Sequence, residues 1–180
     1  MANRGRLAGT KLLLMGSKAF RESKLPTEVA LKIDEAISRN MIILVGEALG
    51  ACRLYQDYLQ SKSYRNVIVG HAKSMRYNAG NWKTTQYGID LKERERRMIE
   101  DCDSAIIIWT DNSGVIAENL ELLKNLEKPT FLYEHSTRTN TTEVGWLDSK
   151  RTYDPYYDMK EHFRKKKQQN RQLTSSHGDL

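Results

Sequence analysis

Cysteine and long apolar runs are both scarce in this sequence. The two cysteines, Cys52 and Cys102, form no Cys-x-x-Cys pair and have no histidine cluster near them. A disulfide framework and a zinc site are therefore not expected, and two buried thiols are the simpler interpretation. No apolar run approaches the roughly 18 residues of a membrane-spanning helix, and residues 11–15 are too short for the signal-peptide core of about 7–15 residues. We expect a cytoplasmic protein with no membrane partner, bound metal or cofactor.

Basic residues are in excess at both ends of the chain. Residues 1–11 carry three basic side chains and no acid, and residues 150–180 carry eight basic side chains against four acidic ones. Because the total net charge is +6, the body between these ends has a net charge of −1. A nearly neutral body is not typical of a nucleic-acid-binding domain, so any binding to polyanions is expected from the basic tail.

Short apolar runs alternate with segments of helical periodicity along most of the chain. This alternation predicts an α/β fold, and right-handed crossovers give a doubly wound, mainly parallel, five-stranded Rossmann-like sheet. We expect a flexible lead over residues 1–10, the Rossmann-like domain over 11–134, and a linker with a basic C-terminal tail over 135–180. The expected strands are residues 11–15, 41–45, 66–70, 104–109 and 130–133, and the expected helices are residues 26–40, 51–60, 90–101 and 115–126.

A glycine turn follows the second expected strand. The strand of residues 41–45 stops at Gly46, and Gly50 opens the next helix. Such a turn presents backbone N–H groups and a helix N-terminus, which can hold a phosphate or another anionic oxygen. The same spacing also occurs where a turn only has to be tight. Polar turns at Gly16 and at residues 113–114 also follow strands, so the three turns are expected to converge on one ligand crevice at the carboxyl edge of the sheet.

A long polar segment, residues 71–89, is expected to be irregular. A loop of this length inside a compact domain is usually a functional flap or a disordered segment. Its aromatic residues Trp82 and Tyr87 suit stacking on a base, although packing of the loop onto the domain is the commoner use. The helix that follows begins at Asp90 and carries the arginine cluster Arg94, Arg96 and Arg97.

Four motifs occur in order along residues 11–134. They are Gly16-Ser17-Lys18 after the first strand, VGEALGACRL at residues 45–54, Trp82 followed by RERRM at residues 94–98, and DSAIIIW at residues 103–109 followed by GVIAE at residues 114–118. This order resembles the SLOG superfamily of Rossmann-like proteins, and most of all its YspA/YpsA-like group. Lonely-guy phosphoribohydrolases belong to the superfamily, and nucleoside deoxyribosyltransferases are related to it. The resemblance implies a nucleotide or a nucleotide-derived sugar as ligand, and a homodimer or a higher homo-oligomer.

The sequence departs from the family pattern at three positions. Cys52 stands where the family has aspartate, Val115 where it has a phosphate-binding threonine, and Glu95 where it has asparagine. Each change removes a polar group that a ligand would use, which is easier to reconcile with binding than with a complete catalytic set. We therefore expect the protein to bind a nucleotide or a nucleotide-derived small molecule, such as an ADP-ribose-like compound or a cyclic nucleotide.

Two other functions remain open. The first is an N-glycosidase or deoxyribosyltransferase acting on a nucleoside monophosphate. The resemblance implies that Arg94 or Arg97 then holds the phosphate, that Glu118 stabilises the sugar cation, and that Glu47 or Glu118 is the nucleophile. However, the helix dipole also favours an acid such as Glu118 in a first turn without any catalytic role. The second is a structural or polyanion-binding protein that acts through its basic tail.

The candidate residues for these functions overlap. The candidate catalytic residues are Glu118, Glu47 and Arg94. The candidate ligand-binding residues are Gly16, Ser17, Lys18, Gly46, Glu47, Gly50, Arg53, Trp82, Arg94, Arg97, Asp111, Ser113 and Gly114.

Overall fold

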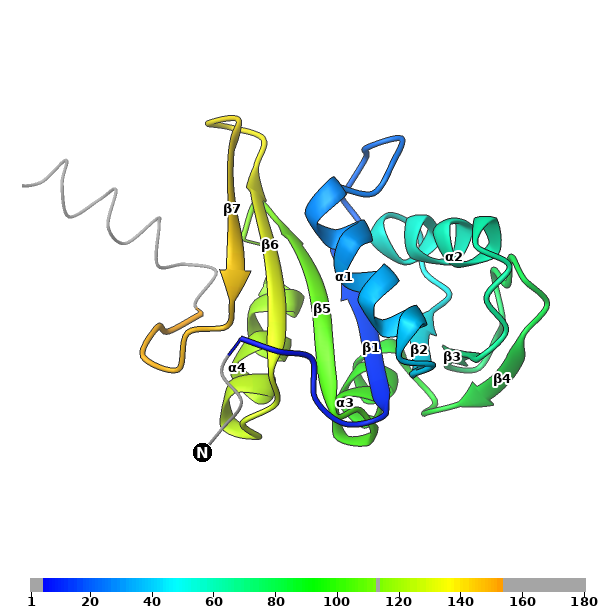
Figure 1. Cartoon of the computed structure of the whole chain (residues 1–180). Coiled ribbons are helices and arrows are strands. Elements are labelled where there is room, and N and C mark those ends of the chain that lie inside the picture. Colours follow the sequence, from blue (N-terminus) through cyan, green and yellow to red (C-terminus); the bar gives the residue numbers. More distant parts are fainter. Residues whose placement is uncertain (1–4, 113, 154–180) are drawn as a thin grey trace, which may run out of the picture.

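The computed structural model describes residues 5–112 and 114–153, which form one seven-stranded sheet and four helices (Figure 1). The strands are β1 (Lys11–Gly16), β2 (Ile42–Gly46), β3 (Val67–His71), β4 (Lys83–Gln86), β5 (Ser104–Thr110), β6 (Thr130–Ser136) and β7 (Thr141–Trp146). The helices are α1 (Thr27–Ser38), α2 (Ala51–Ser61), α3 (Leu91–Asp101) and α4 (Gly114–Asn125). The strand order is β4-β3-β2-β1-β5-β6-β7, and neighbours are parallel except for β6 and β7, which are antiparallel.

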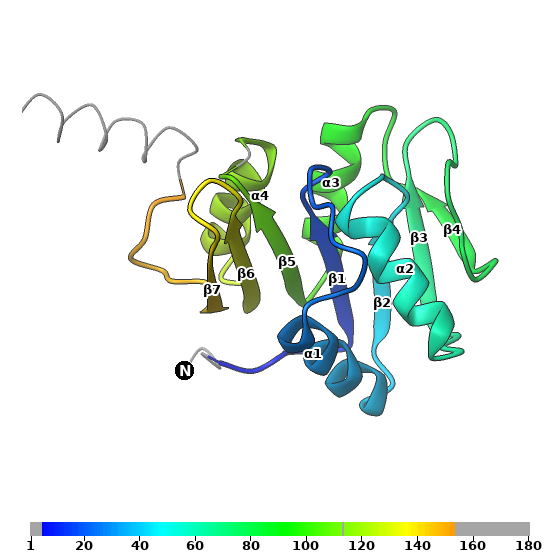
Figure 2. The same ribbon diagram turned by 90° about the horizontal axis from the view of Figure 1, so that it is seen from above.

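Helices cover both faces of the sheet, with α1 and α2 on one side and α3 and α4 on the other (Figure 2). Because successive strand side chains point to opposite faces, a central strand must supply apolar side chains to two cores. β1 does so, since Leu12 and Leu14 pack in the core with α1 and α2, whereas Leu13 and Met15 pack in the core with α3 and α4. The expected doubly wound α/β fold with a mainly parallel sheet is confirmed.

Helix α3 shows how side chains set the limits of an element. Asp90, which precedes the helix, accepts a hydrogen bond from the backbone N–H of Glu93 at 2.8 Å, as an N-cap residue does. At the other end, a cation satisfies the carbonyl groups that have no partner within the helix. The ammonium of Lys128 donates at 2.6–2.8 Å to the carbonyl oxygens of Ile99, Glu100 and Cys102.

The sheet has two strands more than the expected five. β4 lies inside segment 71–89, which the sequence predicts to be irregular, and β7 lies beyond residue 134, where the sequence predicts a linker. Both are edge strands, and most of their side chains are exposed. Neither strand therefore carries the buried apolar pattern by which a strand is recognised in a sequence. The predicted strand count is wrong for this reason.

The N-terminal segment of the described chain is held against the sheet. Leu7 is only 3% exposed, although the sequence predicts a flexible lead there. The carboxylate of Asp103 accepts hydrogen bonds from the backbone N–H groups of Lys11 and the residue before it, at 2.9 and 2.8 Å. The Lys11 ammonium also pairs with Asp101 at 2.8 Å. Burial opposes ionisation of Asp101, but hydrogen bonds from Lys11 and Tyr87 lower its pKa below the ordinary value of 3.8.

The segment after β7 is also fixed, through Arg151. Its guanidinium donates to both carboxylate oxygens of Glu134, each at 2.7 Å. The same group lies over the rings of Tyr153 and Trp109, 4.7 and 5.7 Å from their centroids. Tyr153 is only 4% exposed, so the packed structure extends well past the predicted boundary at residue 134. The basic tail predicted from the sequence lies outside the described residues from residue 154 onward.

Candidate functional site

The chain changes direction across the sheet between β1 and β5, which are neighbours in space. In open sheets of this kind, ligands bind outside the carboxyl ends of the strands at this switch point. Here the two strand ends are linked. The Ser17 N–H donates to the carbonyl oxygen of Ile108, and the Thr110 N–H donates to Ser17 Oγ, both at 2.9 Å. Ser17 is 3% exposed, so it joins the two strands beneath the surface.

The turn of residues 46–50 packs closely against the loop that follows β1. Gly50 has a φ of +79°, and a Cβ there would lie 2.5 Å from the carbonyl oxygen of Lys18 and 2.6 Å from that of Ser17. Only glycine fits this position without a shift of the backbone. The Ala51 N–H, the first of α2, donates to the Ser17 carbonyl oxygen at 3.2 Å. The close approach therefore accounts for Gly50 independently of anion binding.

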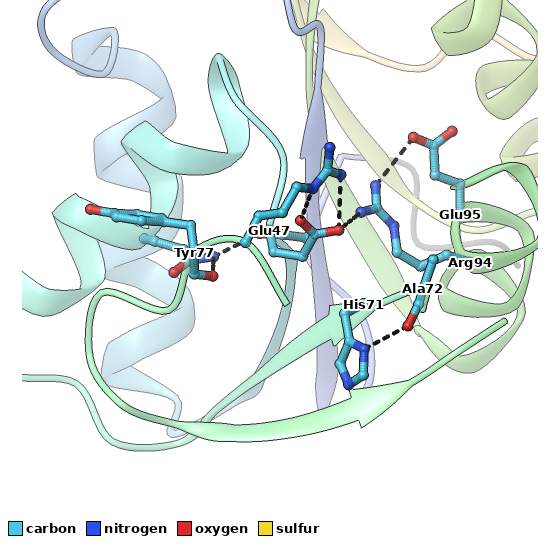
Figure 3. A network of polar contacts seen from close by, with 9 residues as sticks. Glu47, His71, Ala72, Tyr77, Arg94 and Glu95 are labelled. Atoms are coloured by element: carbon cyan, nitrogen blue, oxygen red, sulfur yellow. Dashed lines mark hydrogen bonds and ion pairs between the residues drawn. The ribbon is translucent and has the colours of Figure 1, made fainter. Parts of the chain in front are cut away.

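The same turn positions a buried ion network around Glu47 (Figure 3). The Glu47 side chain is fully buried, at 0% exposure, and accepts hydrogen bonds from two arginines. Arg94 Nη1 donates to Glu47 Oε1 at 2.7 Å. Arg76 donates to both oxygens, from Nε to Oε2 at 2.6 Å and from Nη2 to Oε1 at 3.0 Å. The Arg94 side chain is 3% exposed and that of Arg76 is 48% exposed, so one carboxylate joins a buried guanidinium to an accessible one.

The network continues from Arg94 toward α4. Arg94 Nη2 lies 3.5 Å from Glu95 Oε1, and Asn119 Nδ2 donates to Glu95 Oε2 at 2.9 Å. Arg94 Nε and Thr110 Oγ1 are buried without a hydrogen-bond partner, and they are the only such side-chain atoms in the described part of the chain. Buried polar atoms are nearly always paired. Both exceptions lie at the carboxyl edge, where a ligand or a water molecule can supply the partner.

Loop 72–81, which forms most of the connection between β3 and β4, is attached to α2 through Gln56. The Gln56 side chain is fully buried. Its Nε2 donates to the carbonyl oxygens of Gly46 and Tyr77 at 2.8 and 3.1 Å, and its Oε1 accepts from the Ala79 N–H at 2.9 Å. One side chain therefore joins the glycine turn to the loop.

Two aromatic residues fix the same loop. The Tyr77 ring lies 4.3 Å from the guanidinium of Arg53, and its hydroxyl donates to Asp57. Trp82, directly after the loop, is 8% exposed and donates from its indole nitrogen to the carbonyl oxygen of Tyr64 at 2.8 Å. In this structure Trp82 packs into the core instead of facing solvent, where a base could stack on it.

Part of the predicted site is gathered at the carboxyl edge. Lys18 and Arg53 are exposed there, Lys18 in the loop that contacts Gly50 and Arg53 in the first turn of α2. Gly114 begins α4, and Ser113 lies outside the described residues. The predicted residues that pack together beneath this edge are Gly16, Ser17, Gly46, Glu47, Gly50 and Arg94.

Three other candidates form their polar contacts with residues outside this group. Arg97 is half-exposed and pairs with an acid of its own helix at 2.7 Å. Asp111 has a φ of +51° and accepts hydrogen bonds at 2.7 Å from the backbone N–H and the hydroxyl of Thr137. Glu118 is 66% exposed and lies 3.3 Å from the ammonium of Lys92. The two candidate carboxylates thus have different surroundings, since Glu118 is in solvent and Glu47 is buried.

Sequence reasoning missed several residues that complete the network. Gln56 shares the buried side of α2 with Tyr55 and Leu59, and a polar residue in such a stripe is a usable signal. Asn119 is a similar case, because it lies one residue before the buried Leu120 of α4. Arg76 has no local signal, because only the folded chain brings it to Glu47.

Both cysteines are free and buried, as predicted. Burial raises the pKa of the Cys52 thiol, and it raises the pKa of Cys102 to about 12, so neither is a ready nucleophile. Within residues 5–112 and 114–153, no group of three or more histidine, cysteine or acidic side chains could hold a metal ion. No described helix is both long and apolar enough to cross a membrane.

A cavity of about 720 Å³ lies at the opposite edge of the sheet, between the end of α4, the start of β6 and the segment after β7. None of the predicted site residues lines it. The ammonium groups of its two lysines are engaged. Lys128 donates to three carbonyl oxygens, and Lys124 pairs with Glu121 and donates to the carbonyl oxygen of Arg151. Trp146 contributes the aromatic part of the lining.

A scan against protein-family models gives no match, and a search of curated proteins gives no relative. The resemblance to the SLOG superfamily therefore rests on the sequence motifs alone and stays a prediction. The structure supplies the α/β fold and places the glycine turns at the carboxyl edge. Trp82 lies at the opposite, amino edge, since it precedes β4 and bonds to Tyr64, which precedes β3.

Proposed function

We propose that the protein binds a nucleotide or a nucleotide-derived small molecule, such as an ADP-ribose-like compound or a cyclic nucleotide, at the carboxyl edge of the sheet. One observation carries this proposal. Arg94 Nε and Thr110 Oγ1 are the two buried side-chain atoms without a partner among the described residues. Thr110 ends β5, and Arg94 packs against Gly46 at the end of β2, and these two strands are the neighbours of β1 at the switch point. A ligand with hydrogen-bonding groups at this position would satisfy both atoms.

The charges around the glycine turn favour an anionic group on that ligand. Lys18, Arg53 and Arg76 are exposed cationic side chains on three different segments that meet at the turn of residues 46–50. Phosphate groups are recognised by such clusters together with backbone N–H groups. A nucleotide supplies both the phosphate and the polar sugar and base.

Binding is proposed in preference to cleavage because of the two candidate carboxylates. Both oxygens of Glu47 accept hydrogen bonds from guanidinium groups, which lowers the nucleophilicity of this carboxylate. Glu118 points into an exposed ion pair with Lys92. Membership of the SLOG superfamily is part of the same proposal, and the ligand class follows from it.

The test is a thermal-shift screen of the full chain against nucleoside mono- and diphosphates, ADP-ribose, NAD and cyclic nucleotides. A ligand that binds only the native state raises the Tm. Mass spectrometry of the same mixtures then shows whether the ligand is recovered intact or as free base and sugar phosphate. An intact ligand supports binding, whereas a released base identifies a glycosidase instead.

The site is then located by titration calorimetry with two charge-matched variants. Lys18→Gln removes an exposed cation beside the glycine turn, and Arg65→Gln removes one just before β3, at the opposite edge. A charge-assisted hydrogen bond contributes about 1.5–3 kcal/mol, so Lys18→Gln is expected to weaken affinity by about tenfold or more. Equal affinities of the two variants, or no stabilising compound in the screen, would contradict the proposal.

A further inference from the structure

The accessible part of the ion network is Arg76. Glu47 and Arg94 are 0% and 3% exposed at their side chains, whereas 48% of the Arg76 side chain is exposed. Arg76 belongs to loop 72–81, and its guanidinium covers Glu47 Oε2, which accepts no other hydrogen bond that the described residues provide. The loop therefore closes over the carboxylate by means of this one side chain.

The two arginines of Glu47 differ in what their removal would cost. If Arg76 moved away, Glu47 would keep its 2.7 Å contact with Arg94 and would not become an uncompensated buried charge. Arg94 lies inside the core, and Glu95 also contacts it, so it has no comparable freedom. Arg76 is thus the arginine that can leave Glu47 and bind another anion instead.

The loop is held elsewhere by contacts that do not depend on Arg76. Gln56 binds its backbone at Tyr77 and Ala79, and Arg53 lies over the Tyr77 ring. These contacts fix the second half of the loop to α2. In the first half, residues 72–76, Ala72 is buried and Met75 packs against the core, and the last residue is held by the ion pair between Arg76 and Glu47.

We propose that the ion pair between Arg76 and Glu47 is a latch that closes loop 72–81 over the ligand site at the carboxyl edge. An anionic group of the ligand releases the latch by drawing the Arg76 guanidinium away from Glu47. This inference deepens the proposed function and rests on it for the nature of the ligand. Its first test needs no nucleotide, so its failure is distinguishable from a failure of the ligand screen.

The test is hydrogen–deuterium exchange of the full chain, followed by mass spectrometry of peptides covering loop 72–81. Arg76→Gln removes the charge of the latch. Arg97→Gln is the matched control, because Arg97 is 51% exposed and pairs with Glu93 at the same close range. We expect amide exchange in the loop to rise about tenfold in Arg76→Gln and to stay unchanged in Arg97→Gln. Unchanged exchange in Arg76→Gln, or an equal rise in both variants, would overturn the latch.

Peptides from β1 and β5 report general destabilisation in the same experiment. Their exchange is expected to stay at the level of the unmodified protein, and a rise in loop and strands together would show unfolding and refute a local latch. Inorganic pyrophosphate is the anionic probe, with sodium chloride at equal ionic strength as control. It should raise loop exchange in the unmodified protein and leave Arg76→Gln unaffected. No response to pyrophosphate in the unmodified protein would overturn release by an anion.

Discussion

Replacing Arg94 by methionine tests how the buried ion network contributes to stability. Methionine keeps an unbranched apolar stem and removes the guanidinium. The change deletes the 2.7 Å hydrogen bond to Glu47 and the 3.5 Å contact with Glu95. It also removes the buried Nε that has no partner.

The expected cost follows from what the two carboxylates keep. Breaking a buried ion pair by removing one partner costs about 3–5 kcal/mol when the remaining charge has no other partner. Here Glu47 keeps two hydrogen bonds from Arg76, and Glu95 keeps one from Asn119. We therefore expect a smaller loss, about 2 kcal/mol in the free energy of unfolding.

The measurement is equilibrium unfolding in urea, followed by circular dichroism. A fall in the midpoint with an unchanged m-value would show a change in stability alone. Arg96→Met is the control, because Arg96 forms an exposed pair with Glu100 in the same helix. Such pairs contribute about 0–1 kcal/mol. A cost for Arg94→Met no larger than that of the control would refute the reasoning, and so would a gain in stability.

Three further predictions concern the backbone, the thiols and pH. Gly50→Ala should cost more than about 2 kcal/mol in urea unfolding, because Gly50 has a positive φ and a Cβ would clash with backbone, whereas Gly145→Ala meets nothing within 4 Å and should be mild. Cys52 and Cys102, whose pKa values are raised by burial, should react with a thiol reagent at pH 8 only on unfolding; fast reaction of the folded protein would contradict their burial. Because the folded-state pKa of Asp101 is lowered, its ionised form stabilises the protein above pH 3.8, and this contribution is lost as pH falls through the folded value. The difference in unfolding free energy between the unmodified protein and Asp101→Asn should thus become smaller as the pH falls below 3.8. A difference that became larger there would show that the pKa of Asp101 is not lowered by folding.

The central part of the fold can be predicted because its strands are buried on both faces. β5 is buried at every residue, and its sequence SAIIIWT is recognisable without any partner. β4 and β7 owe their conformation to hydrogen bonds with one neighbouring strand, and most of their side chains face solvent. The sequences KTTQ and TTEVGW do not show a pattern of buried apolar residues from which a strand could be predicted. The edge strands of the sheet therefore could not be predicted as the central strands were.

The candidate site divides along similar lines. The glycine turn can be predicted from the local sequence, because a tight turn after β2 and a positive φ at residue 50 both require glycine. The partners of Glu47 cannot be predicted as a set, because Arg76 and Arg94 reach it from a loop and a helix distant in the chain. Local sequence shows that a charge exists, and only the fold shows whether another charge compensates it.

The position of β1 has a consequence for synthesis on the ribosome. Leu12 of β1 pairs with Ser104 of β5. At a translation rate of ~5–20 residues per second, β5 is therefore synthesised about 5–20 s after β1. β2, β3 and β4 are made earlier and can already pair with one another and with β1. During that interval β1, whose residues 12–15 are apolar and buried in the folded protein, is an unprotected edge, open to strands of other nascent chains. Chains arrested before β5 are therefore expected to aggregate and to depend on chaperones, whereas chains that also contain β5, β6 and β7 are not.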